Sequence, residues 1–148
     1  MNREIKFRAW GGNTMWYPET KTVDGNNTTL NFFNPQLGIV WGLYDNKFDY
    51  RVCSGEHHEL MQFTGLKDKN GTEIYEGDIV KMLCPYRENE VICEIRYVNG
   101  GFVVEANGWF NGGEADVTTV GWAIDQDIEI GVIGNIYEHP ELTKIQTT

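Results

Sequence analysis

An Asn-Gly pair between two apolar runs constrains the fold of this chain more than any other feature. The pair is Asn70-Gly71, and it lies within Leu60–Lys81, which reads LMQFTGLKDKNGTEIYEGDIVK. Asn-Gly in this setting is the strongest short signal for a β-hairpin, because both residues of a two-residue type I′ turn require positive φ. Gly77–Val80 at the end of the segment is typical of the start of a further strand in a small barrel.

Short strands are also predicted on both sides of this hairpin. Seventeen glycines spread along the 148 residues favour many turns and few long helices. Ile5–Trp10 alternates apolar and basic residues before a Gly-Gly turn, which predicts a strand that returns through Met15–Tyr17. Later strands are predicted at Val91–Val98 and, after an Asn-Gly-Gly turn, at Phe102–Ala106, then at Val117–Ile124 and Ile128–Tyr137.

The whole pattern predicts an all-β protein built from small antiparallel sheets. We expect an N-terminal β subdomain at residues 1–62 and a C-terminal β-barrel at residues 63–148, divided near Phe63–Gly65. Of the five tryptophans, Trp10, Trp41 and Trp122 fall within strand-like segments, which predicts that they are core residues.

The location of the protein follows from what its sequence lacks. No segment approaches the roughly 20 apolar residues that a membrane-spanning helix needs, and the N-terminus has no apolar signal-peptide core. The three cysteines, Cys53, Cys84 and Cys93, are an odd number without a secretory signal, so free thiols are expected. We expect a cytoplasmic protein with no membrane association.

Acidic charge dominates the second half of the chain. The formal net charge is −10, and from Tyr97 onward eight Asp and Glu residues stand against one Lys. Phosphate binding needs Lys and Arg, so direct binding of nucleic acid is disfavoured. Asp125, Asp127 and Glu129 alternate with other residues, which predicts a row of charge on one strand face. Such a row is either a solvated sheet face or a mimic of nucleic-acid phosphates that captures a basic protein.

Three blocks of sequence resemble the YopX family of small phage and prophage proteins. They are Ile5–Trp10, the block from Leu60 to Val80 described above, and Val132–Leu142 with its sequence VIGNIYEHPEL. They come in the family's order and span nearly the whole chain. The resemblance implies an all-β fold whose C-terminal part is similar to an SH3-type barrel, and it implies no assigned activity and no catalytic or binding residues. Gly11-Gly12 departs from the family, in which an acidic residue is more usual, and this affects only a turn.

Two groups of residues have the composition of a metal site. Cys53, His57 and His58 are close in sequence, but a zinc site wants four ligands, and distant residues such as Cys84, Cys93 or His139 would have to complete it. Glu73, Glu76 and Asp78 are three carboxylates in six residues, as in a metal-dependent hydrolase. Acids at the start of a strand more often cap loops, so we expect no metal, no cofactor and no catalytic residues.

Trp109-Phe110 is the strongest candidate for a contact site. This aromatic pair lies in the Gly-rich segment NGWFNGGEAD among polar residues, where it either folds back on the barrel or is buried in an interface. The sequence therefore predicts a non-enzymatic phage or prophage protein that forms homo-oligomers or binds an unidentified protein. The alternatives are a nucleic-acid-linked regulator and a metal-dependent hydrolase. The candidate interaction residues are Trp109, Phe110, Asp125, Asp127 and Glu129.

Overall fold

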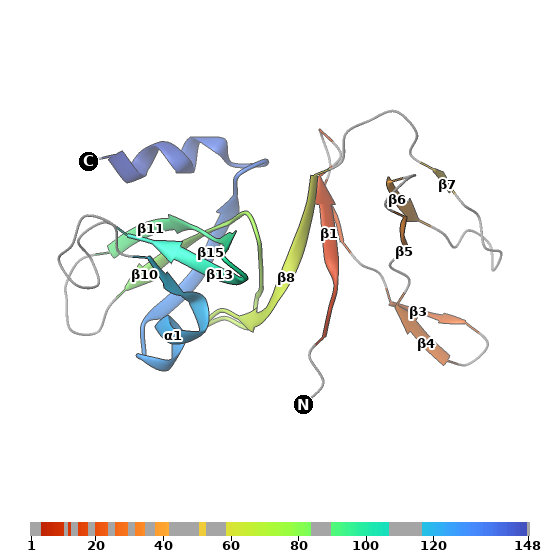
Figure 1. Cartoon of the computed structure of the whole chain (residues 1–148), viewed down its shortest axis with the longest axis horizontal. Helices are drawn as coiled ribbons and strands as arrows, with labels where there is room; N and C mark the ends of the chain where they lie inside the picture. Colours follow the sequence, from red (N-terminus) through yellow and green to blue (C-terminus); the bar gives the residue numbers. More distant parts are fainter. Residues whose placement is uncertain are drawn as a thin grey trace. The chain divides into compact units, whose positions relative to one another are not determined.

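The computed structural model describes residues 4–10, 12, 15–17, 20–23, 26–29, 32–34, 38–41, 51–52, 59–83, 90–106 and 117–147. Its residues form two compact units, one of Glu4–Gln62 and one that includes Phe63–Thr148. Most of the described residues lie in short antiparallel strands, as predicted (Figure 1). Within those residues, no helix is long and apolar enough to cross a membrane.

The described residues of the N-terminal unit form three small sheets. Strand β1 (Phe7–Trp10) pairs with β2 (Met15–Trp16), which confirms the predicted first hairpin, and also with the first residues of β8 (Glu59–Lys67). Ala9 of β1 is buried opposite Leu60 of β8. The other two sheets are β3 (Thr20–Val23) with β4 (Asn26–Thr29), and β5 (Phe32–Asn34) with β6 (Gly38–Trp41) and β7 (Arg51–Val52).

Two three-stranded antiparallel sheets form most of the second unit. The first has the order β11-β10-β15, from β11 (Glu90–Glu94), β10 (Asp78–Leu83) and β15 (Glu129–Asn135). The second has the order β12-β13-β14, from β12 (Arg96–Val98), β13 (Gly101–Glu105) and β14 (Val117–Thr119). Among the described residues, no ladder of backbone hydrogen bonds joins these sheets into a closed barrel.

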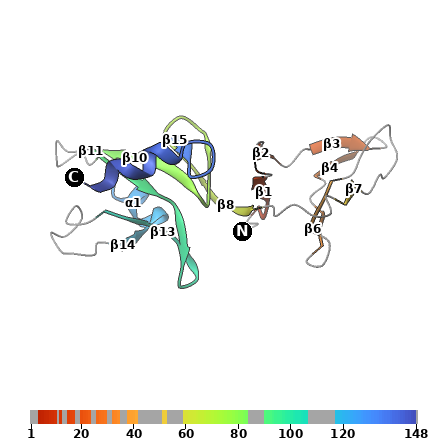
Figure 2. The ribbon, with the colours of Figure 1, turned by 90° about the horizontal axis from the view of Figure 1, so that it is seen from above.

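Three further elements belong to the described part of this unit. Strand β9 (Glu73–Tyr75) pairs with the second half of β8, the short helix α1 (Val120–Asp125) follows β14, and the 3₁₀ helix η1 (Pro140–Thr147) follows β15. Helix η1 packs beside β11, as both views show (Figures 1 and 2).

The predicted long strand Val91–Val98 is divided at Ile95. The backbone N–H of Ile95 donates to the carbonyl of Asp78 at 2.8 Å, and its carbonyl accepts from Gly77 N at the same distance. These bonds draw the backbone of Ile95 toward the Gly77–Asp78 turn. The chain leaves the first sheet there and enters the second, so β11 and β12 belong to different sheets.

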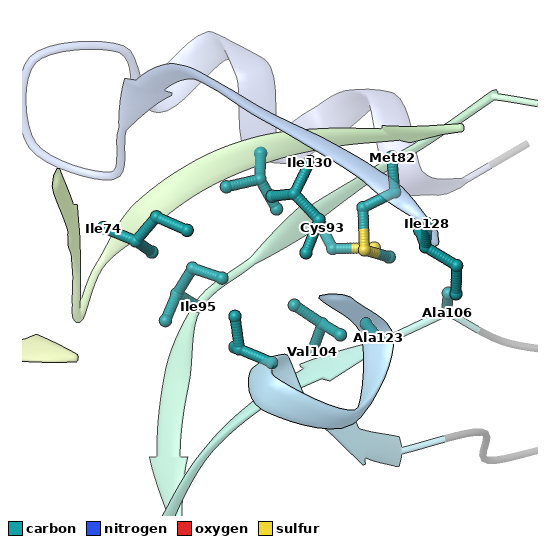
Figure 3. Close-up of a cluster of buried hydrophobic side chains, with 11 residues drawn as sticks. Ile74, Met82, Cys93, Ile95, Val104, Ala106, Ala123, Ile128 and Ile130 are labelled. Carbon is teal, nitrogen blue, oxygen red and sulfur yellow. The ribbon is translucent and has the colours of Figure 1, made fainter. Parts of the chain in front are cut away.

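A single core lies between the two sheets and α1. Ile74, Met82, Cys93, Ile95, Val104 and Ile128 are among its buried residues, and their side chains converge in Figure 3. Successive residues of a strand point to opposite faces, which explains why Val80 and Met82 of β10 both reach this core. Each strand contributes only one or two such side chains, so the core exists only when both sheets are formed.

Helix α1 replaces most of the strand predicted at Val117–Ile124. Only Val117–Thr119 is extended, and the Oγ1 of Thr119 then accepts a hydrogen bond from Trp122 N at 3.2 Å as an N-cap. Val120 and Ala123 are buried at helical spacing. Trp122 points away from them and is 45% exposed, so the prediction that it is a core residue is wrong.

Candidate functional site

The second sheet presents an outer face, which consists of Arg96, Val98, Val103, Glu105, Val117 and Thr119. The register pairs Arg96 with Val103 and Thr119, and Glu105 with Val117, so these side chains share one side of the sheet. The opposite side carries Val104, which is fully buried in the core. The outer face is therefore the side of the sheet that points away from that core.

Two of the three apolar side chains on this outer face, those of Val98 and Val117, are exposed, whereas that of Val103 is buried. Val98 is 39% and Val117 is 49% exposed, at the two ends of the face, and Arg96 and Glu105 form an ion pair between them. On the other side of the hairpin tip, the half-exposed Tyr97 packs edge-on against Phe102 with ring centroids 5.2 Å apart. Strands β12 and β14 are the ends of the described sheet, and an edge strand offers its outward backbone groups to another strand.

The predicted contact pair belongs to the segment that joins two strands of this sheet. Trp109 and Phe110 lie outside the described residues, between β13 and β14 in the chain, and Val117 opens β14. Val98 and Val117 were not among the candidates predicted from the sequence. Strand alternation could have indicated that Val98 is exposed, because it places Val98 on the same face as the charged Arg96.

The predicted row of acids on one strand face is wrong. Asp125 is the last residue of α1, Asp127 has φ of 58° in the turn that follows, and Glu129 is the first residue of β15. The helix forms because Thr119 caps it, so the period-two alternation does not apply to these residues. All three are exposed, and Glu129 forms a 3.2 Å ion pair with Lys69. The regular charge spacing that suggested phosphate mimicry is therefore absent from this segment.

The three carboxylates considered for metal-dependent hydrolysis also do not converge. Glu73 accepts a hydrogen bond from the Tyr75 hydroxyl at 3.0 Å, whereas Asp78 is fully buried and accepts from Tyr75 N at 2.7 Å. Gly77 has φ of 81°, which breaks the alternation expected to align Glu76 with Asp78. Within the described residues, no group of three or more His, Cys, Asp or Glu side chains is placed to hold a metal ion. Cys53, His57, His58 and Cys84 lie outside those residues.

Asp68, another acidic residue of the central block, binds backbone groups. The carboxylate of Asp68 accepts hydrogen bonds from Asn70 N at 2.8 Å, Thr72 N at 2.9 Å and Val132 N at 2.9 Å. Asp68 thereby links the β8–β9 turn to Val132 of β15, which is 64 positions away in sequence. Charge-assisted bonds of this kind are stronger than bonds between neutral groups, so Asp68 stabilises the fold.

The closing block VIGNIYEHP forms a compact turn held by polar contacts. The side-chain oxygen of the buried Asn135 accepts from Tyr137 N at 3.1 Å and Glu138 N at 2.8 Å, and its amide donates to Glu138 Oε2. The His139 ring lies against Gly134, where an added Cβ would come within 2.7 Å of Nδ1. The glycine is therefore required by close packing, and this block has a structural role.

Cys93 is buried in the core and is expected to be unreactive in the folded protein. Burial, together with the nearby charge of Glu105, raises the pKa of its thiol to about 12, so the reactive thiolate is scarce at neutral pH. We predict that iodoacetamide alkylates Cys93 on the order of 100-fold more slowly in the native protein than in urea. Peptide-resolved mass spectrometry measures both rates, and similar rates would contradict the burial of this thiol.

Glu94 is predicted to destabilise the protein at neutral pH. Burial raises the pKa of its carboxyl above the usual value; Arg96 opposes this shift and Glu76 adds to it. A raised folded-state pKa favours folding below the unfolded pKa of about 4.3, and that contribution is lost as pH rises through the folded pKa. Glu94→Gln should therefore stabilise the protein at neutral pH, by less than about 1 kcal/mol because the group is partly exposed.

Urea unfolding at two pH values tests this prediction. Near pH 3.5, where Glu94 is largely protonated in both states, the variant and the wild type should unfold alike. The matched control is Glu90→Gln on the same strand. Oε2 of Glu90 lies 3.0 Å from Nζ of Lys81 in an exposed ion pair, so removing the charge of Glu90 should leave stability unchanged or slightly lower. A Glu94→Gln protein that is less stable than the wild type at neutral pH would refute the assignment.

Comparison with known proteins places the chain in a family. The sequence pattern that defines the YopX protein family matches residues 6–144, which is nearly the whole chain. This chain belongs to the YopX protein family. The SPbeta prophage-derived uncharacterized protein YopX of Bacillus subtilis (strain 168) is 38% identical over 136 residues, covering 92% of this chain and 93% of its own length.

Solved structures agree with this assignment. The crystal structure of the Bacillus subtilis YopX protein superposes with a TM-score of 0.65 at 27% identity, over 92% of this chain and 95% of that one. A crystallised protein of Enterococcus faecalis superposes with a TM-score of 0.52 at 25% identity, over 95% and 99% of the two chains. The family resemblance drawn from the three sequence blocks is thus confirmed, and no catalytic function is indicated for these YopX-family relatives.

Proposed function

We propose that this YopX-family chain is a prophage-encoded protein of the bacterial cytoplasm that acts without catalysis, by forming homo-oligomers through the outer face of its second sheet. The relative in Bacillus subtilis is prophage-derived, which supports the phage origin. The observation that carries the proposal is the exposure of Val98 and Val117 on this face, and Val117 begins β14 directly after the segment that contains Trp109-Phe110. Exposed apolar surface of this kind is favourable to bury against another protein surface.

An SH3-like barrel is the proposed architecture for residues 63–148. The chain order supports it, because β10 pairs with the last strand, β15, and the β11–β12 segment passes from one sheet to the other. A short helix also separates the third strand of the second sheet from the closing strand. In this architecture the outer sheet face is a rigid platform, since its inner side is anchored in the core through Val104.

The structural roles of the ionisable side chains support a non-enzymatic protein. Asp68 and Asp78 are buried, and their carboxylates accept the hydrogen bonds described above from backbone N–H groups of the same unit. A hydrolase would need carboxylates that converge on a shared metal or water. Self-association needs only surface, and two edge strands and exposed valines provide it.

Replacing both Trp109 and Phe110 with alanine tests the proposal. We expect the W109A/F110A protein to retain the circular-dichroism spectrum of the wild type while its mass by light scattering falls toward the 17.0 kDa of one chain. Ile5→Ala is the control, because Ile5 is an exposed apolar residue of the other unit and its replacement should leave the mass unchanged. If the double variant keeps the mass and the pull-down partners of the wild type, this surface is not the site of self-association.

A further inference from the structure

Two Asn-Gly pairs in the described part of the chain occupy turns of different construction. Asn99 and Gly100 form a two-residue hairpin loop between β12 and β13, with φ of 50° and 83°, as a type I′ turn requires. In the other turn Gly71 has φ of 81°, but Asn70 is not among the residues of positive φ. Both pairs are solvent-exposed, so water reaches both.

The Asn70-Gly71 turn is held by bonds on every side. Gly71 N, the atom that would have to react, donates to the Asp68 carbonyl at 3.0 Å. The Asp68 carboxylate binds Asn70 N and Thr72 N, and the preceding Lys69 N donates to the Ile130 carbonyl of β15 at 3.0 Å. Moving this turn out of its geometry breaks several hydrogen bonds, including charge-assisted ones, which are stronger than bonds between neutral groups.

The Asn99-Gly100 turn has much weaker anchoring. It joins a ladder of three residue pairs, and every residue of β12 is exposed. At both Gly71 and Gly100 an added Cβ would meet no atom within 4 Å, so access to the attacking nitrogen is open in both turns and the difference lies in the hydrogen bonds that hold them. Glycine also places no side chain in the way of an attack by its own nitrogen. Local opening at the end of a short exposed hairpin therefore requires little free energy.

We propose that Asn99 is a site of spontaneous deamidation in the folded protein and that Asn70 is protected. The Gly100 backbone nitrogen, after losing its proton to base, attacks the side-chain carbonyl carbon of Asn99. A bond forms between this nitrogen and the carbonyl carbon, and the bond from that carbon to Nδ2 breaks. Ammonia is released, and the product is a succinimide ring. Water then opens the ring at either carbonyl and yields aspartate or isoaspartate.

The products change the hairpin that carries the outer sheet face. Either product adds a negative charge to a chain whose formal charge is already −10. Isoaspartate also lengthens the backbone by one carbon, which a two-residue type I′ turn does not accommodate, so the β12–β13 pairing is disturbed. Modification at Asn99 thus alters the pairing of β12, which is an edge strand of the sheet, and changes the position of Val98 on it.

Peptide mapping of the intact protein after incubation in mildly alkaline buffer tests the proposal. In the native protein we expect Asn99 to convert at least about tenfold faster than Asn70, because opening the Asn70-Gly71 turn breaks more hydrogen bonds. In urea, where neither turn is formed, the two rates should agree. Similar native rates at the two sites would overturn the proposal. The protein is digested with a protease that cleaves after Glu, so cleavage after Glu94, Glu105 and Glu114 places Asn99 in one peptide and Asn107 and Asn111, which lie outside the described residues, in another.

A second variant tests the cause of the protection. In Asp68→Ala the two side-chain bonds to Asn70 N and Thr72 N are gone, so the rate at Asn70 should rise severalfold while the rate at Asn99 stays constant. A circular-dichroism spectrum checks that the variant is folded. If the variant is unfolded, the comparison of the Asn99 and Asn70 rates in the wild-type protein still decides the proposal. An unchanged rate at Asn70 in a folded variant would remove Asp68 as the protecting group.

Discussion

Replacing Ile95 with alanine is expected to lower the free energy of unfolding by about 4 kcal/mol, because Ile-to-Ala changes in a closed core leave a cavity as well as removing buried surface. Ile95 is fully buried at the point where the chain passes between the two sheets, and its side chain meets residues of both (Figure 3). Collapse around the cavity is restricted, because the Ile95 backbone is also bound to Gly77 and Asp78.

The matched control for this change is Ile133→Ala. Ile133 lies in the middle of β15 and is 39% exposed, so its truncation removes little buried surface and should cost less than about 1 kcal/mol. Urea unfolding followed by circular dichroism measures both variants. Equal losses of stability would mean that Ile95 does not join the two sheets through a shared core.

The second large effect is expected for Asp68→Asn, which should cost about 2 kcal/mol. The substitution keeps the size of the side chain and one carbonyl oxygen for Asn70 N and Thr72 N. The new amide group, however, meets Val132 N, and two donors then face each other where a 2.9 Å bond existed. The link between the β8–β9 turn and β15 is lost as a result.

Asp127→Asn is the control for this substitution. Asp127 is exposed and has φ of 58°, a conformation that asparagine adopts at least as readily as aspartate, so stability should change by less than about 0.5 kcal/mol. The same change of charge thus occurs at both positions. If the two variants lose similar amounts of stability in urea, the hydrogen bonds of Asp68 do not stabilise the fold.

Local sequence signals were sufficient where neighbouring residues determine the structure. The β1–β2 hairpin and the hairpin around Asn99-Gly100 have their predicted strands, and the latter adopts the type I′ turn. The hairpin at Asn70-Gly71 is also present, but its turn type is different because the Asp68 side chain binds the amides that a tight turn would have used. Its connection spans residues 68–72, between the paired Lys67 and Glu73.

Contacts between distant residues account for what the sequence did not reveal. The division of Val91–Val98 depends on bonds from Ile95 to Gly77 and Asp78, and no local pattern at Ile95 reports them. Helix α1 formed where apolar residues alternate, because its Val120 and Ala123 also fit a helical face and Thr119 supplies a cap. The acidic row through Asp125 and Glu129 disappeared for the same reason.

The candidate contact surface was predicted only in part. Aromatic residues in a polar loop drew attention to Trp109 and Phe110, whereas the exposure of Val98 and Val117 required the register of the sheet. Valine is enriched in strands in general, so the residue type alone did not indicate which valines of this sheet are exposed.

The mass of the wild-type protein in solution tests the central claim most directly. Sedimentation velocity over a range of concentrations should show a species whose mass is a multiple of 17.0 kDa and whose share grows with concentration. A single species of 17.0 kDa at every concentration would contradict self-association through the outer sheet face.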